Sequence, residues 1–269
     1  QSHFAIAEAG DKMLDGWVHK NNALAMEVWG QISRYMSFLA DHQELYTTVS
    51  CVSKLGIVAP PHIPSFEVSL TRASLYNALV EMNIMYDVLL LHRLTPAMLA
   101  PYKAIIIPNI TWMEESQLAA IRTYKQGGGK VYTIGSTPEL HGAADRYSHP
   151  EIFGRLGEEN ARTELARELQ QLEGDPLVTL TDAPYVAANL VRKNGTNRFI
   201  LHLVNYDKPL RNVRVRLDLT GFSKKIDRKK IHCLSPDLEA SIPVQATAKG
   251  SLLEFTLPSL EVYNVVVIN

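Results

Sequence analysis

The sequence predicts an α/β domain with a mostly parallel sheet, followed by a small antiparallel β-sandwich and preceded by a helical segment. Apolar side chains recur at helical spacing in residues 22–46, strand-like and helix-like runs alternate through residues 52–141, and short runs with period-two alternation fill residues 177–269. The expected parts are a helical lead-in at residues 1–50, an α/β domain at 51–174 and a β-sandwich at 175–269.

Length, charge and cysteine count narrow the class of protein. The chain has 269 residues, of which 46% are hydrophobic and 20% charged, as in ordinary globular proteins. Its net charge of -1 argues against a nucleic-acid or anionic-membrane partner held by bulk electrostatics. Two cysteines cannot build a disulfide scaffold or a four-cysteine zinc site, and they leave the cellular compartment open. No apolar run approaches the ~20 residues of a membrane helix.

The lead-in is predicted to be one amphipathic helix over residues 22–46. Its apolar positions recur every three or four residues and are Leu24, Val28, Ile32, Tyr35, Met36, Leu39 and Leu45. Such a stripe must be buried against another surface. Because no strand precedes it, the pattern is typical of the closing helix of a fold whose earlier part is absent.

In the α/β domain, short apolar runs predict strands and longer runs with helical spacing predict helices. The predicted strands are residues 52–59, 86–91, 104–107 and 130–134, and the predicted helices are residues 70–82 and 114–126. Thr111 and Glu114 have the spacing of a capping box before the second helix. Gly127-Gly128-Gly129 follows that helix and precedes a strand, which favours a left-handed helix C-cap over a phosphate-binding loop.

The β-sandwich is predicted after a helix over residues 161–172 that ends at Gly174-Asp175-Pro176. Asn194-Gly195 is a hairpin signal between the first two strands. The predicted strands are residues 185–192, 198–205, 213–219, 230–234, 251–257 and 262–268.

Candidate catalytic residues follow the strand at 130–134, because ligands of α/β sheets bind beyond the carboxyl ends of the strands. Gly135 and Ser136 match the start of a nucleophile elbow, but its second glycine is missing. Glu139 and His141 come shortly after and could supply a base. Polar loop residues are the favoured interpretation of Ser136, Glu139 and His141, and a small hydrolase using them is the alternative.

No cofactor or metal site is expected. The histidines lack the paired helical spacing that fixes two metal ligands. Cys51 and Cys233 flank or occupy predicted strands, so we interpret them as small core residues rather than thiolates.

The predicted sandwich is locally basic. Arg214 and Arg216 alternate with apolar neighbours, which predicts a solvated strand face that protects a sheet edge. Aromatic interleaving of the kind that stacks nucleic-acid bases is missing. A carbohydrate-binding module remains an alternative function, although the three tryptophans precede the sandwich.

Several segments, taken in order, resemble the region that follows the catalytic barrel in bacterial β-galactosidases and related glycoside hydrolases. That region holds a glutamine-amidotransferase-like domain, called the β-galactosidase trimerisation domain, and a C-terminal β-sandwich. The matching segments are residues 38–46 (FLADHQELY), 102–109 (YKAIIIPN), 127–131 (GGGKV), 202–206 (HLVNY), 233–237 (CLSPD) and 260–267 (LEVYNVVV).

The resemblance implies a flavodoxin-like α/β domain and a non-catalytic accessory or oligomerisation role. In such enzymes the acid and nucleophile glutamates lie on the barrel, which is absent from this chain. An amidotransferase requires a cysteine nucleophile, whereas the candidate elbow carries Ser136. The implied partners are a catalytic barrel or neighbouring subunits of a homo-oligomer, and carbohydrate is a further candidate. The chain is then either a piece of such a protein or a free-standing relative.

Overall fold

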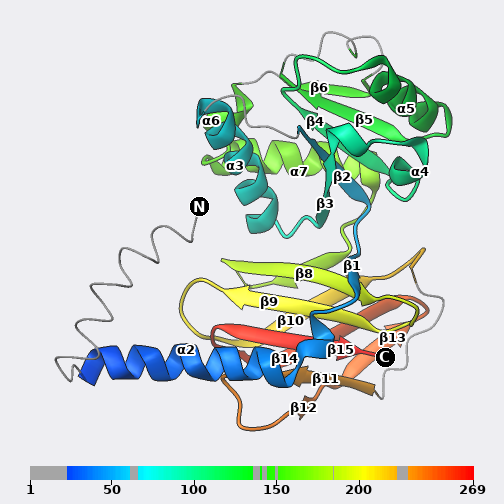
Figure 1. The fold of residues 1–269 in the computed structure, drawn as a ribbon. Helices are drawn as coiled ribbons and strands as arrows, with labels where there is room; N and C mark the ends of the chain where they lie inside the picture. Colours follow the sequence, from blue (N-terminus) through cyan, green and yellow to red (C-terminus); the bar gives the residue numbers. More distant parts are fainter. Residues whose placement is uncertain are drawn as a thin grey trace. The chain divides into compact units, whose positions relative to one another are not determined.

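We describe residues 23–60, 66–135, 140, 144–148, 151–183, 185–222 and 230–269 of a computed structural model (Figure 1). The chain divides into two units, Gln1–Thr48 and Val49–Asn269, and each is described by itself. None of the helices in these described ranges is both long and apolar enough to cross a bilayer.

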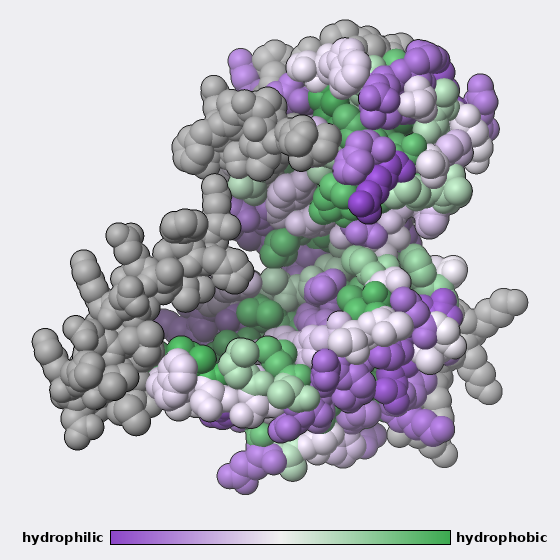
Figure 2. Space-filling model, in the orientation of Figure 1, coloured by the Kyte–Doolittle hydropathy of each residue, from purple (hydrophilic) through white to green (hydrophobic). Residues whose placement is uncertain are grey.

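The first unit contains the predicted lead-in helix. Helix α2 spans Ala23–Asp41, and the 3-10 turn η1 follows at Gln43–Leu45. Most of the helix predicted over residues 22–46 is therefore confirmed. Four of its large hydrophobic side chains are exposed, namely Trp29, Ile32, Met36 and Leu39. Figure 2 shows hydrophobic residues in green along the surface of α2.

The second unit contains a five-stranded sheet in the order β3-β2-β4-β5-β6, with every pair parallel. Its strands are β2 (Leu55–Ala59), β3 (Tyr86–Leu90), β4 (Ala104–Pro108), β5 (Lys130–Ile134) and β6 (Arg146–Ser148). The helices are α3 (Phe66–Glu81), α4 (Pro96–Leu99), α5 (Glu115–Gln126), α6 (Ile152–Arg155) and α7 (Glu159–Glu173), with the 3-10 turn η2 at Leu91–Arg93.

Helices cover both faces of this sheet, as the sequence predicted. Successive residues of β4 point to opposite faces, so Ile105 belongs to one apolar core and Ile106 to the other. Ile121 of α5 packs in the first core. Leu79 of α3 and Leu165 of α7 pack in the second core. The strands are continuous apolar runs in the sequence because helices cover both faces of the sheet.

The capping box of α5 is real but begins three residues later than predicted. Glu114, rather than Thr111, is the N-cap. The Glu114 side chain accepts from the backbone N–H of Gln117, and the Gln117 Oε1 accepts from the Glu114 N–H at 2.9 Å. Gln117 can close this box because a glutamine at the third helical position reaches back as well as a glutamate does.

The glycine run after α5 forms the C-terminal end of that helix, which confirms the predicted left-handed C-cap. Gly128 has φ +92, in the left-handed region. Gly129 has a separate reason to be glycine, because a Cβ there would lie 2.2 Å from the ring of Tyr124.

Two antiparallel sheets form the remainder of the second unit and enclose one core. The six-stranded sheet has the order β1 (Val49–Cys51), β8 (Val186–Lys193), β9 (Phe199–Asn205), β15 (Tyr263–Ile268), β11 (Ile231–Leu234) and β12 (Ile242–Pro243). The four-stranded sheet has the order β13 (Ala246–Lys249), β14 (Leu252–Leu260), β10 (Leu210–Asp218) and β7 (Val178–Thr181). Leu201 and Leu203 meet Leu217 and Leu257 in the shared core.

The predicted hairpin joins β8 to β9 across a loop at residues 194–198, closed by the bond from the Lys193 N–H to the Arg198 carbonyl. Gly195 has φ +74. Strand β1 was not predicted; it comes before the parallel sheet in sequence and pairs with β8, Ser50 opposite Arg192. Three residues are too few to show a period, and their partner lies far along the chain.

Candidate functional site

The predicted strand-end residues Ser136, Glu139 and His141 lie outside the described residues, so the structure does not test whether they converge. Two described residues at the same edge of the sheet are Gly135, which follows β5, and Asn109, which follows β4.

Gly135 and Asn109 form a tight and strained corner. Both have positive φ, +81 for Gly135 and +48 for Asn109. The Asn109 N–H donates to the Ile134 carbonyl at 2.6 Å, and the Gly135 N–H donates to the Ser148 carbonyl at 2.9 Å. A Cβ on Gly135 would lie 2.9 Å from the Asn109 Oδ1, so glycine is required there on two counts. Backbone strain of this kind is commonly concentrated where a loop must hold a fixed position.

Both cysteines are thiols rather than thiolates. Burial raises the pKa of Cys233 to about 12, and burial together with the charge of Asp87 raises the pKa of Cys51 to about 11. Cys233 is 1% exposed in the sandwich core, while the partly buried Cys51 donates to the Tyr86 carbonyl. Neither meets the requirement of a nucleophile that is ionised near neutral pH.

A buried polar cluster lies between β5, β6 and α7. The hydroxyls of Tyr132 and Ser148 are 2.5 Å apart, and the Tyr132 side chain is fully buried. Burial, and after it the charge of Glu168, raises the pKa of Tyr132. The Glu168 Oε2 is buried and has no hydrogen-bond partner within the described part of the chain. Ser148 is the last residue of β6, so this cluster supports the same edge of the sheet as Gly135.

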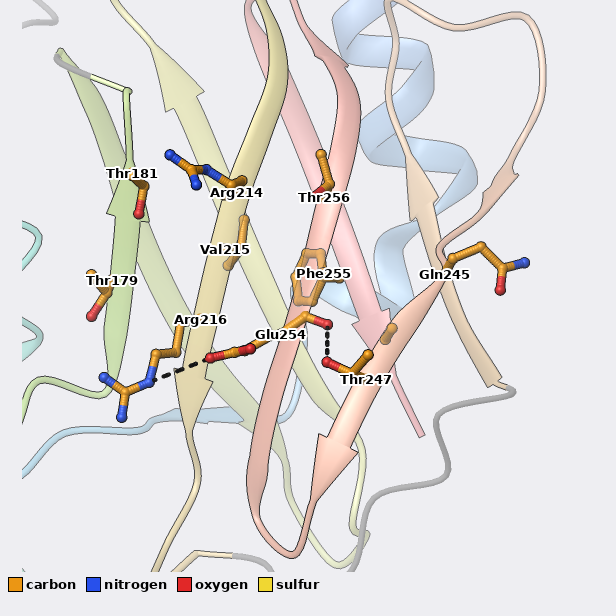
Figure 3. A pocket seen from close by; sticks show the side chains of 11 residues that line it. Thr179, Thr181, Arg214, Val215, Arg216, Gln245, Thr247, Glu254, Phe255 and Thr256 are labelled. Atoms are coloured by element: carbon orange, nitrogen blue, oxygen red, sulfur yellow. Dashed lines mark hydrogen bonds and ion pairs between the residues drawn. The ribbon is translucent and has the colours of Figure 1, made fainter.

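A cavity lies on the outer face of the four-stranded sheet (Figure 3). Its volume is about 720 Å³. Inward residues such as Val215 and Phe255 belong to the core, and the outward positions are polar. These outward residues are Thr179, Thr181, Arg214, Arg216, Thr247, Glu254 and Thr256.

The charges on this face are paired and exposed. The Arg214 Nη2 lies 2.6 Å from the Asp182 Oδ2, and the Arg216 Nε lies 3.9 Å from the Glu254 Oε1. Exposed pairs of this kind contribute about 0.2–1 kcal/mol each to stability. The prediction that Arg214 and Arg216 are solvated is confirmed. The edge-protecting role was wrong, because β10 lies between β14 and β7 inside the sheet. The face can exchange hydrogen bonds with a polar ligand.

The described cavities lack the carboxylate pair that glycoside hydrolysis requires. The cavity on the four-stranded sheet is lined by one carboxylate, Glu254, and the cavity between α3 and β8 by one, Glu81. Two further cavities, around Gly128 and around Gly174, are lined by none. Within the described ranges, no group of three or more His, Cys, Asp or Glu side chains could hold a metal ion.

The sequence did not support a sugar-binding platform among the aromatic residues of the sandwich, but two of these residues, Tyr185 and Tyr206, lie beside the α3–β8 cavity. Tyr185 is 65% exposed and Tyr206 is 73% exposed, and both line this cavity. The hairpin signal at Asn194-Gly195 alone does not find them, because a two-residue turn there would place residue 185 opposite residue 204. The observed loop at residues 194–198 places residue 185 opposite residue 206.

No protein-family model and no curated protein matches the sequence. Among solved structures, the chain is similar to α-L-fucosidase isoenzyme 2 from Paenibacillus thiaminolyticus, with a TM-score of 0.70 and 14% identity over 87% of this chain and 51% of that one. It also matches a rhamnosidase from Novosphingobium sp. PP1Y (TM-score 0.47, 14% identity, 81% of this chain and 22% of that one). A third match is a GH42 β-galactosidase from G. stearothermophilus (TM-score 0.47, 11% identity, 81% of this chain and 40% of that one).

These structural neighbours are glycoside hydrolases. The chain spans about half the length of the fucosidase, of which 51% is covered. At 14% identity the similarity is one of fold, and the fold is the mixed α/β arrangement of one parallel and two antiparallel sheets described above.

Proposed function

We propose that this chain is a non-catalytic accessory and oligomerisation region of a glycoside-hydrolase-like protein. The observation that carries the proposal is the fold, which matches an α-L-fucosidase over 87% of this chain while covering 51% of that enzyme. In this proposal residues 51–174 form an amidotransferase-like domain of flavodoxin type, and residues 175–269 form the sandwich that completes it. The strand order β3-β2-β4-β5-β6 supports the flavodoxin type, because it is the order 2-1-3-4-5 counted along the chain.

The side chains that line the described cavities support a non-catalytic role. Retaining and inverting glycosidases both need two carboxyl groups, roughly 5 to 10 Å apart across the sugar. Each described cavity holds at most one, as Glu81 and Glu254 illustrate. The raised pKa values of the partly buried Cys51 and the buried Cys233 likewise argue against glutamine hydrolysis.

The exposed apolar side chains of α2 support an oligomerisation or docking role. Ile32, Met36 and Leu39 are 43%, 61% and 38% exposed and recur at helical spacing. An exposed apolar row of this length marks a surface that binds protein. In the proposal, its partner is a catalytic barrel or a neighbouring subunit.

Sedimentation equilibrium of the purified chain tests the assembly role. The proposal predicts a species heavier than one chain, and Met36→Glu should shift it toward the monomer. Arg34→Glu changes charge on the same helix without removing an apolar residue and serves as the control. A monomer at all concentrations, with no change caused by Met36→Glu, would count against oligomerisation.

A further inference from the structure

Tyr185 and Tyr206 are neighbours because of the β8–β9 register. Val186 of β8 lies opposite Asn205 of β9, so the next residues outward are Tyr185 and Tyr206. The Tyr206 N–H donates to the Tyr185 carbonyl at 3.0 Å and continues the ladder by one pair. Both tyrosine side chains line the same cavity.

The backbone at both tyrosines is held in place. Tyr185 has φ +61, a left-handed conformation that is unfavourable for an L-residue. Tyr206 lies in a turn fixed by Asn205, which is 5% exposed. The Asn205 Nδ2 donates to the Lys208 and Glu261 carbonyls, both at 2.9 Å, and its Oδ1 accepts from the Asp207 N–H. These bonds fix the turn that carries Tyr206, and the Tyr185 carbonyl is tied to that turn by the Tyr206 N–H.

Helix α3 supplies polar groups to the same cavity. Asn77 and Glu81 lie four residues apart on one helix face, and Val80 lies between them. The Glu81 Oε2 lies 3.5 Å from the Arg162 Nη1. Arg162 is itself anchored by donating to the Leu156 and Gly157 carbonyls at 3.0 and 2.9 Å. The carboxylate of Glu81 is thus oriented by a fixed cation.

Hydrogen bonds hold the segment that connects β1 of the sandwich to β2 of the parallel sheet. Ser53, which is 5% exposed, donates to the Met85 carbonyl at 2.7 Å, four residues after α3 ends at Glu81. The Lys54 Nζ donates to the Asp175 carbonyl at 2.9 Å. These bonds order the segments that precede β2 and β3 and the segment that follows α7, and the first and last of these connect the two parts of the second unit.

We propose that Tyr185 and Tyr206 form the aromatic wall of a binding site for a neutral pyranose sugar, with Asn77 and Glu81 hydrogen-bonding its hydroxyl groups. A pyranose ring has an apolar C–H face that packs on an aromatic ring and a rim of hydroxyls that needs amide and carboxylate partners. The cavity of about 330 Å³ is at the small end of ligand sites, which suits one or two sugar rings. The negative charge of Glu81 disfavours acidic sugars.

This site goes beyond the accessory role proposed above and does not depend on it. A chain that assembles with no barrel at all would still bind the sugar, and a chain that binds no sugar could still be an accessory region. The sugar-binding experiment can therefore contradict the sugar site without contradicting the accessory role, and the sedimentation experiment can contradict the accessory role without contradicting the sugar site.

Saturation-transfer NMR on the full chain tests the site. The probes are the methyl α- and β-pyranosides of glucose, galactose, mannose and N-acetylglucosamine at ~10 mM, because a ligand of this size binds with a Kd on the order of 1 mM. At least one probe should give transfer to its ring protons, and the amide signals of Asn77, Glu81 and Ala187 should shift on titration.

Tyr185→Gly and Tyr206→Ala should each raise the Kd at least about fivefold. Tyr185→Gly removes the ring while suiting the positive φ, so it should leave the fold intact. Trp112→Ala is the matched control, because Trp112 is 65% exposed and does not line this cavity. The Kd of the Trp112→Ala variant for the sugar should stay within about twofold of that of the unmodified chain.

Three results would overturn the proposal. The first is the absence of transfer from every probe to the unmodified chain. The second is an equal loss of binding in Trp112→Ala. The third is that the unmodified chain binds no sugar and Tyr206→Ala changes its sedimentation. This result would assign the tyrosines to a protein interface.

Discussion

The carbonyl of Tyr185 accepts the N–H of Tyr206 at 3.0 Å, although Tyr185 itself is in the left-handed region with φ +61. The bond that extends the β8–β9 ladder is thus made by a residue whose own conformation is unfavourable. A side chain that is 65% exposed gains little from burial that could offset this cost. A strained and exposed position of this kind supports the sugar site proposed for Tyr185.

Replacing Tyr185 with glycine should be better tolerated than the same change at Tyr206. Tyr185→Gly removes the cost of positive φ, whereas Tyr206→Gly only adds chain entropy to the unfolded state. We expect the free energy of unfolding of Tyr185→Gly to exceed that of Tyr206→Gly by about 1 kcal/mol. Urea denaturation followed by circular dichroism measures both, and the opposite ranking would show that Tyr185 is not strained.

Gly135→Ala should destabilise the chain by about 1–3 kcal/mol. The new Cβ would lie 2.9 Å from the Asn109 Oδ1, and φ +81 disfavours any L-residue. Gly157→Ala is the control, because its Cβ meets nothing within 4 Å and its φ is not positive. Equal unfolding midpoints for the two variants would show that the corner at Gly135 and Asn109 is not strained.

The hydroxyls of Tyr132 and Ser148 should be energetically coupled. Tyr132→Phe and Ser148→Ala each break the 2.5 Å contact, and Ser148→Ala leaves the buried Tyr132 hydroxyl without this partner, at a cost of about 1–2 kcal/mol each. The double variant should cost less than the sum of the two, because the lost bond is counted once. Strict additivity in urea denaturation would mean that the two groups do not interact.

Stability should fall as the pH drops from about 7 to 4, in part through His202. Burial lowers the pKa of His202 to about 4 from an unfolded value near 6.5, so the folded chain holds this ring neutral. Below pH 6.5 the unfolded chain takes up the proton first and is favoured, and the loss is complete once the pH falls through the folded pKa. Between pH 7.5 and 5 this amounts to up to about 2 kcal/mol.

His202→Gln preserves a polar partner for the Tyr263 hydroxyl, which lies 2.7 Å from the His202 Nδ1. Its free energy of unfolding should vary less between pH 7.5 and 5 than that of the unmodified chain. Parallel pH profiles for the two proteins would assign the acid sensitivity to other groups.

Much of the fold follows from the sequence because burial leaves a local pattern. Ile105 and Ile106 indicate a strand covered on both faces, and the alternation of Val215 with Arg214 and Arg216 predicts which side of β10 faces water. The cap of α5 was misplaced because Thr111 is the better N-cap by residue type, yet Glu114 and Gln117 close the box.

The α3–β8 cavity could not be predicted from local pattern, because its parts come from segments that are far apart. Asn77 and Tyr206 are brought together only by how α3 meets the sandwich. Strand β6 was missed for a similar reason: residues such as Tyr147 give no period over three positions, and pairing with β5 alone defines the strand. Ser136, Glu139 and His141 remain a sequence prediction.

The most direct test of the accessory role is hydrolysis by the purified chain. Release of p-nitrophenol from its β-galactoside, α-L-fucoside and α-L-rhamnoside, and of ammonia from glutamine, should equal the rate with heat-denatured protein. The Ser136→Ala variant should give the same traces as the unmodified chain. Turnover that rises with chain concentration and disappears in Ser136→Ala would contradict the account and establish an enzyme at the carboxyl edge of the parallel sheet.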